Sequence, residues 1–178
     1  LAGPRGAALT DTADARPELM EIRRLARAGD PAQALAVAQK ALAAAPEDPV
    51  LINEVAVLQI KTKAVAPAIE ALRALVSRKP DFHRGWFNLG LALGQSGQPA
   101  EARAAYERAI ALLPNHLESH VNLGMLLLDQ GDAKGAVAIL EKATGFGGGD
   151  EKARAFFSYG VALGRSGRPD DAFAAYTK

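Results

Sequence analysis

Apolar residues recur along the chain at the spacing of amphipathic helices from about residue 15 onward. Leu19, Ile22, Leu25 and Ala26, for example, share one helical face at steps of three, six and seven residues. Glycine and proline then interrupt the pattern, as in residues 29–31 (GDP), because proline is well tolerated at the first position of a new helix. The pattern predicts ten helices and no strand, with the helices at roughly 16–28, 31–44, 49–62, 65–78, 83–96, 99–112, 117–130, 133–144, 152–166 and 169–178.

The predicted helices repeat with a period of 34 residues. Ala34, Ala68, Ala102 and Ala136 are each 34 residues apart. A fixed period between 20 and 50 residues indicates a solenoid, in which one small unit stacks on copies of itself. We expect five units, each made of a helix, a tight glycine turn and a second helix. The expected units are 15–48, 49–82, 83–116, 117–150 and 153–178, the last one truncated.

A two-residue insertion separates the fourth unit from the fifth, since Gly124 and Gly160 are 36 residues apart. We expect the extra residues to lie in a loop at 144–150, where added length costs little. Residues 1–14 (LAGPRGAALTDTAD) show no apolar period, and we expect a tail or linker there. The repeat domain is therefore expected to span residues 15–178.

Three glycines stand midway along the first helix of their units, at Gly90, Gly124 and Gly160. A glycine inside a helix costs about 1 kcal/mol relative to alanine. Its recurrence at one position indicates a compensating gain, which we expect to be a close approach of the second helix. The small residues expected to face the glycines are Ala102, Ala136 and Ala172.

The third unit, residues 83–116, resembles the tetratricopeptide repeat almost throughout. That family's pattern asks for an aromatic residue, Leu-Gly, a bulky residue, a turn glycine, a small alanine, an aromatic residue, another alanine and a proline. These positions hold Trp86, Leu89, Gly90, Leu93, Gly97, Ala102, Tyr106, Ala109 and Pro114. The fourth unit also matches, although His120 replaces the aromatic residue and Gly148 the proline, and the first two units are more degenerate. The resemblance implies an all-α fold, a right-handed superhelix of antiparallel helix pairs with a concave face lined by the first helix of each pair.

An apolar stripe crosses the concave face that the resemblance implies, through Val57, Leu91, Met125 and Val161. Contiguous apolar surface marks binding sites, and an apolar groove suits an amphipathic helix or an extended peptide. We therefore predict that a protein or peptide partner binds there. The predicted groove residues are Asn53, Val57, Phe87, Asn88, Leu91, Val121, Asn122, Met125, Leu128, Phe157 and Val161. The alternative occupant is the chain's own tail or sequence that continues beyond Lys178.

Asn88, Asn122 and Ser158 occupy equivalent places on three consecutive first helices. This arrangement is similar to the asparagine ladder in the repeat arm of protein O-GlcNAc transferases, which implies binding to a peptide backbone. Ordinary solvated polar residues explain the three equally well. The carboxylate clamp of repeat-containing co-chaperones is not expected, because its cationic places hold Phe87, Leu91, Asn122 and Glu118.

Composition and motifs argue against catalysis, cofactors and nucleic acid. The net charge is +1, there is no cysteine, and no apolar run approaches the roughly 18 residues that span a membrane. His116 and His120 have the spacing of metal ligands, but we expect both to pack against neighbouring residues. The glycine run at 145–149 follows a predicted helix and precedes two acidic residues, so we do not expect it to bind phosphate. We predict no catalytic residue, no metal site and no cofactor.

The sequence therefore predicts a non-enzymatic scaffold for protein–protein interaction. The alternative is a recruitment arm of a larger enzyme, such as a glycosyltransferase, sulfotransferase or dioxygenase. The chain begins at Leu1 and stops inside its last helix, so we expect a fragment or a processed product. Phe173 and Tyr176 are then expected to lack cover, which predicts weak self-association through residues 156–178. The Ala-, Gly- and Arg-rich composition suggests a bacterial source and leaves the compartment open between cytoplasm and periplasm.

Overall fold

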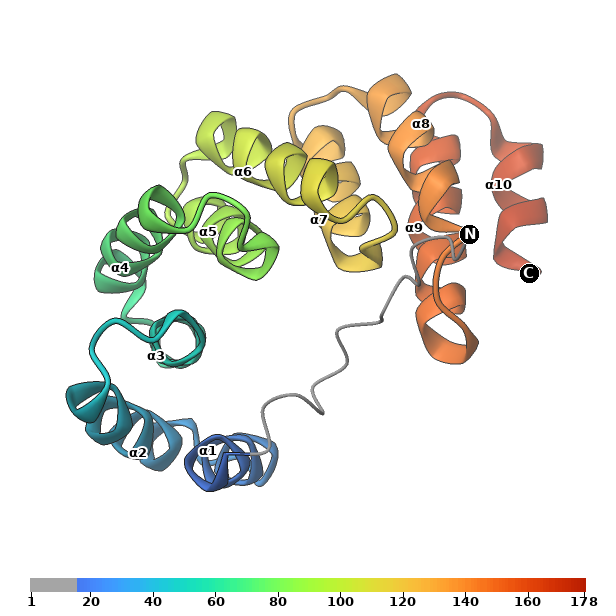
Figure 1. Cartoon of the computed structure of the whole chain (residues 1–178). Helices are drawn as coiled ribbons and strands as arrows, with labels where there is room; N and C mark the ends of the chain where they lie inside the picture. Colours follow the sequence, from blue (N-terminus) through green and yellow to red (C-terminus); the bar gives the residue numbers. More distant parts are fainter. Residues whose placement is uncertain (1–15) are drawn as a thin grey trace, which may run out of the picture.

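The computed structural model describes residues 16–178 as ten helices, and no strand occurs among those residues. The helices follow one another along an open arc (Figure 1). They are α1 (Pro17–Arg27), α2 (Pro31–Ala44), α3 (Pro49–Lys61), α4 (Val65–Arg78), α5 (His83–Gln95), α6 (Pro99–Leu112), α7 (Leu117–Asp129), α8 (Ala133–Ala143), α9 (Gly149–Arg165) and α10 (Pro169–Tyr176). Every predicted helix is present, whereas the tail expected at 1–14 lies outside the described residues. Within 16–178 we find no helix with the length and apolar character needed to cross a bilayer.

The start of α9 differs from the prediction. The helix begins at Gly149 rather than at residue 152, so the loop expected over 144–150 is shorter than predicted. Asp150 and Glu151 lie in its first turn. Acidic side chains there stabilise the N-terminus of a helix, because the exposed backbone N–H groups carry partial positive charge. Part of the insertion therefore lengthens the helix instead of the loop.

The odd-numbered helices line the inner side of the arc and the even-numbered helices cover the outer side (Figure 1). The extensive packing joins helices that follow each other in sequence, and it also joins α3 to α5, α5 to α7 and α7 to α9. A helix pair cannot bury its apolar faces alone, so each pair is completed by the next one. The inner surface is thus built from the first helices of the units, as expected.

Tight turns with positive φ connect the two helices of each unit. Gly29, Gly97, Gly131 and Gly167 have φ between 76° and 84°. This region favours glycine because a Cβ atom would approach the following carbonyl group. Lys63 occupies the same place in the second unit with φ of 67°. The turn has the same geometry there, although this backbone conformation is strained for a residue with a Cβ atom.

The mid-helix glycines are sites of close helix contact, but the facing residues differ from those predicted. A Cβ atom on Gly90 would lie 2.7 Å from the ring of Tyr106. Gly124 and Gly160 face Leu140 and Tyr176 in the same way. The prediction that Ala102, Ala136 and Ala172 face the glycines is wrong, because the contact lies one helical turn further along the second helix. These alanines are buried instead beside that contact.

Replacing Gly90 with alanine tests this contact. The Tyr106 ring is only 4% exposed, so it has little room to move away from an added methyl group. We expect Gly90→Ala to lower the free energy of unfolding by about 1–3 kcal/mol, the usual cost of overpacking, in a urea titration. Gly94 on the same helix has open space around its Cβ position, so Gly94→Ala should be neutral or slightly stabilising. Equal destabilisation by both changes would contradict the contact.

Candidate functional site

The structure places the predicted apolar stripe along the inner surface. Val57 lies on α3, Leu91 on α5, Met125 on α7 and Val161 on α9. Met125 is 36% exposed, and the other three side chains are partly exposed. These four helices pack in succession, so the stripe crosses four units. It is an apolar strip that solvent reaches from the concave side.

Four of the other predicted groove residues lie deeper than a partner would reach. Asn53, Asn88, Val121 and Leu128 are each less than 10% exposed. Val121 and Leu128 belong to the apolar core, and Asn53 and Asn88 bond to each other between α3 and α5. Phe157, in contrast, is 62% exposed.

The polar ladder is engaged within the chain. The side-chain Nδ2 of Asn88 donates to Oδ1 of Asn53 at 2.8 Å, which links α5 to α3. Asn122 donates to the carbonyl oxygen of Glu118, four residues earlier on its own helix. Ser158 donates to the carbonyl oxygen of Arg154 in the same way. A peptide backbone would have to compete with these bonds, and the Asn53–Asn88 pair is the most deeply buried of them.

Aromatic and histidine side chains pack together at one border of the groove. The ring of His116 makes edge contacts with Phe87 and His83, with centroids 5.0 and 5.6 Å apart. Burial lowers the pKa of both histidines, so both rings are neutral at pH 7. His120 is 2% exposed and packs against Phe146, as predicted. In the part of the chain that the structure describes, no three acidic or histidine side chains converge on one point that would suit a metal ion.

Charged side chains border the apolar stripe. Arg154 on α9 pairs with Glu118 on α7 at 3.4 Å, across two neighbouring units. Arg165 on α9 donates to the carbonyl oxygen of Leu128 on α7, also at 3.4 Å. Exposed ion pairs of this kind contribute little to stability but affect how a charged partner is oriented.

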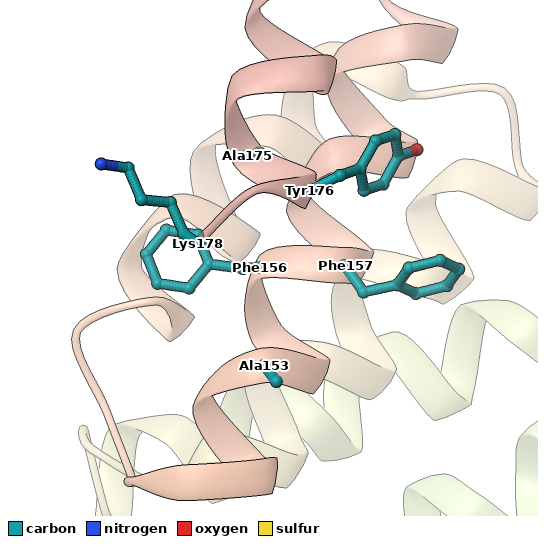
Figure 2. Close-up of a pocket in the computed structure, with 6 residues that line it drawn as sticks. All are labelled: Ala153, Phe156, Phe157, Ala175, Tyr176 and Lys178. Atoms are coloured by element: carbon teal, nitrogen blue, oxygen red, sulfur yellow. The ribbon is translucent and has the colours of Figure 1, made fainter.

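A second apolar surface lies at the C-terminal end of the arc. Phe157 and Tyr176 extend to the same side of α9 and α10, with ring centroids 5.7 Å apart, whereas Phe156 and Lys178 lie on the other side (Figure 2). Together with Ala153 and Ala175 these residues line a shallow pocket of about 270 Å³. Phe173 is 71% and Tyr176 49% exposed, which confirms that these rings lack cover.

Sequence reasoning missed a cleft on the outer side of the arc, between α4 and α6. Trp86 lies in this cleft, and Ala104 and Ala105 form part of one wall. In the sequence, only the adjacent alanines on α6 could have indicated this cleft. Pairs of alanines are so frequent in this chain that this pair does not stand out.

Two family models of the tetratricopeptide repeat match the chain, at residues 25–89 and at residues 87–151. Together they cover well over half of the 178 residues. The chain belongs to the tetratricopeptide repeat (TPR) family.

Solved TPR-like structures share the fold at low sequence identity. The crystal structure of MamA superposes with a TM-score of 0.73 at 23% identity, covering 88% of this chain and 90% of that one. The TPR protein TTC0263 of Thermus thermophilus gives a TM-score of 0.75 at 24% identity, covering 90% of this chain and 87% of that one. The predicted fold, a right-handed superhelix of antiparallel helix pairs, is confirmed.

Curated relatives match over part of the TPR region only. The protein O-mannosyl-transferase TMTC1 of Mus musculus is 34% identical over 98 residues, which is 53% of this chain and 10% of the relative. The Homo sapiens protein of the same name gives the same identity and covers 11% of its length. The chain thus spans about a tenth of these relatives.

The buried asparagine pair can be tested by its effect on stability. Asn88→Ala would leave Oδ1 of Asn53 without its hydrogen-bond donor in a site that is 5% exposed. We expect a loss of about 1–3 kcal/mol in the free energy of unfolding, measured by urea titration. Asn122→Ala is the matched control, because Asn122 is more exposed and bonds only to its own helix, and it should cost less than about 0.5 kcal/mol. A larger effect at Asn122 than at Asn88 would contradict this assignment.

Proposed function

We propose that this TPR chain is a non-catalytic scaffold whose concave groove binds a peptide or helix of a partner protein. The observation that carries the proposal is the apolar stripe formed by Val57, Leu91, Met125 and Val161 on four successive inner helices. Contiguous apolar surface that is still partly exposed, as it is here, often marks a site where a partner binds. Membership of the TPR family supports an interaction role in general.

The shape and chemistry of the groove favour a partner with apolar side chains at regular intervals. Leu91 and Met125 lie near the middle of the stripe and would contact the central anchors of a bound helix or strand. The charged border, with the Arg154–Glu118 pair, would bias the direction in which the partner lies. Phe157 extends the apolar surface at the C-terminal end.

Peptides selected from a random library against this chain provide the probe for the groove. We expect Leu91→Asp combined with Met125→Asp to weaken binding of the selected peptides at least tenfold, because two buried apolar contacts would be replaced by desolvated charges. Fluorescence polarisation would measure the dissociation constants. Far-UV circular dichroism and the melting temperature would show that the doubly substituted chain is folded.

The matched control places the same two charges on the outer surface. Ala36 on α2 and Ala138 on α8 are exposed, so Ala36→Asp with Ala138→Asp should leave peptide affinity unchanged. Selected peptides that bind the groove variant as tightly as the parent chain would show that the groove is not the site.

The second candidate function is a recruitment arm that belongs to a larger enzyme. The partial match to TMTC1 favours it, since the matched segment is 10% of a much longer protein that is named as an O-mannosyl-transferase. In this case the groove would hold a substrate protein for a separate catalytic domain. The full open reading frame distinguishes the two: several hundred further residues with strand patterning favour the arm, and their absence favours the scaffold.

We also propose that the C-terminal surface mediates weak self-association. Phe173 holds the place that Val137 holds in the preceding unit, where Val137 packs on Leu163, Ala172 and Ala175 of the fifth unit. Phe173 is 71% exposed among residues 16–178, and a second copy of the chain can cover it through the same surface. The opposite end of the arc carries charged residues on α1 such as Glu21 and Arg24, which suits it poorly for the same role.

Sedimentation velocity would test the self-association. We expect a concentration-dependent dimer that Phe157→Ser combined with Phe173→Ser weakens at least tenfold, since two exposed rings leave the interface. Met20, which is 60% exposed on α1, supplies the control: Met20→Ser should have no effect. A chain that stays monomeric at millimolar concentration, or a dimer lost only with Met20→Ser, would refute the proposed surface.

A further inference from the structure

A cleft of about 650 Å³ opens on the outer face of the arc, on the side opposite the groove. Its two sides are the outer helices α4 and α6, and the inner helix α5 lies between them (Figure 1). The lining residues are Arg73, Val76, Ser77, Pro80, Trp86, Leu89, Leu93, Glu101, Ala104, Ala105 and Arg108. Most of this lining is apolar, and the three charged side chains stand at the rim.

Small side chains on α6 form one wall of the cleft, and the following unit carries larger residues at the equivalent place. In the following unit Ile139 occupies the place of Ala105, and Phe146 packs over His120, which occupies the place of Trp86. In the cleft, Ala105 leaves room and Trp86 is only partly buried. The open volume is therefore not repeated in the same form in the fourth unit, whereas Ala71 and Ala175 show that the small residue itself recurs in the second and fifth units.

The floor of the cleft is prepared for an apolar group. Nε1 of Trp86 donates to the carbonyl oxygen of Pro80 at 3.0 Å, so the polar atom of the indole already has a partner. The rest of the ring offers apolar and aromatic surface. Aromatic rings in such positions are frequent anchors for a bulky side chain of a partner.

The rim adds a cation beside this floor. Arg108 donates to the same Pro80 oxygen as Trp86, at the long distance of 3.4 Å, so its guanidinium group lies next to the indole nitrogen. Arg73 is bound to Glu101 across the cleft at 2.5 Å, which balances its charge. The rim thus carries one net positive charge. Arg108 makes only a long hydrogen bond, to the neutral carbonyl group of Pro80. A carboxylate would pair with it far better.

We propose that this cleft binds the C-terminal residue of a partner polypeptide, with its bulky apolar side chain on Trp86 and its carboxylate on Arg108. A C-terminal Leu or Phe carries both groups on one residue, which matches the close spacing of the indole and the guanidinium group. The cleft is open along the surface, so the rest of the peptide continues outward instead of being enclosed. The site is separate from the groove and does not depend on the groove proposal.

The single tryptophan of the chain reports directly on this site. Trp86 is the only tryptophan among the 178 residues, so its indole N–H gives one signal in a ¹⁵N-correlated NMR spectrum. The probes are N-acetyl-leucine and N-acetyl-phenylalanine at millimolar concentration, each compared with its C-terminal amide. We expect both acids to shift the indole signal with saturation, and the amides to bind at least fivefold more weakly because they lack the carboxylate.

Two substitutions test the residues of the cleft, and the chain itself shows that the fold accepts both. Ala74 and Glu70 in the second unit occupy the places of Arg108 and Ala104. Arg108→Ala should reduce binding of the acids to the level of the amides. Ala104→Glu, which places a negative charge on the wall, should weaken the acids further and leave the amides less affected.

The outcomes separate this site from the groove. Leu91→Asp with Met125→Asp should leave binding of the acids unchanged, whereas Ala104→Glu should leave the groove-selected peptides unaffected. Equal binding of acid and amide, no effect of Arg108→Ala, or no saturable shift with either acid would overturn the C-terminal residue as the ligand. Tighter binding by peptides with an internal acidic residue than by those with a free C-terminus would overturn it as well.

Discussion

Each helix pair depends on one close contact in which a small residue on one helix receives a large residue from the other. In three units the small partner is Gly90, Gly124 or Gly160 on the inner helix. The first unit reverses the arrangement, since Ile22 stands at the glycine position and Ala38 faces it from α2, and both are buried. The summed size of the pair is what matters, because a packed interior tolerates neither a void nor an overlap. The spacing of the two layers, and with it the curvature of the groove, follows from this contact.

The fold was predictable from sequence because glycine and proline mark nearly every helix end and the same pattern occurs in several units. The start of α9 was missed because the inserted residues are compatible with both loop and helix. The partner of Gly90 was missed for a different reason. The repeat shows alanine at the place of Ala102 in every unit, whereas the place of Tyr106 varies in residue type, so the pattern favours the invariant alanine as the partner. Only the relative placement of the helices shows that the variable residue faces the glycine.

The candidate sites were predictable in part. A helical face can be read from spacing, so the stripe from Val57 to Val161 was found. The spacing of residues does not show how deeply each one is buried. Asn53, Asn88 and Val121 are buried because of the way neighbouring helices pack, which the sequence pattern does not reveal. The outer cleft forms between α4 and α6, and no sequence pattern reveals it until these helices are in position. Two surfaces on opposite faces allow one partner on each without competition.

The arc is held together only by contacts between near neighbours, so a load applied to its ends passes through every junction in series. Among consecutive helices, the least extensive packing is that between α6 and α7, and α5 packs less on α7 than α7 packs on α9. The junction between the third and fourth units is therefore among the least extensively packed in the arc. The groove crosses this junction between Leu91 and Met125. A pull or push on the two ends of the arc would therefore change the width of the groove at its centre.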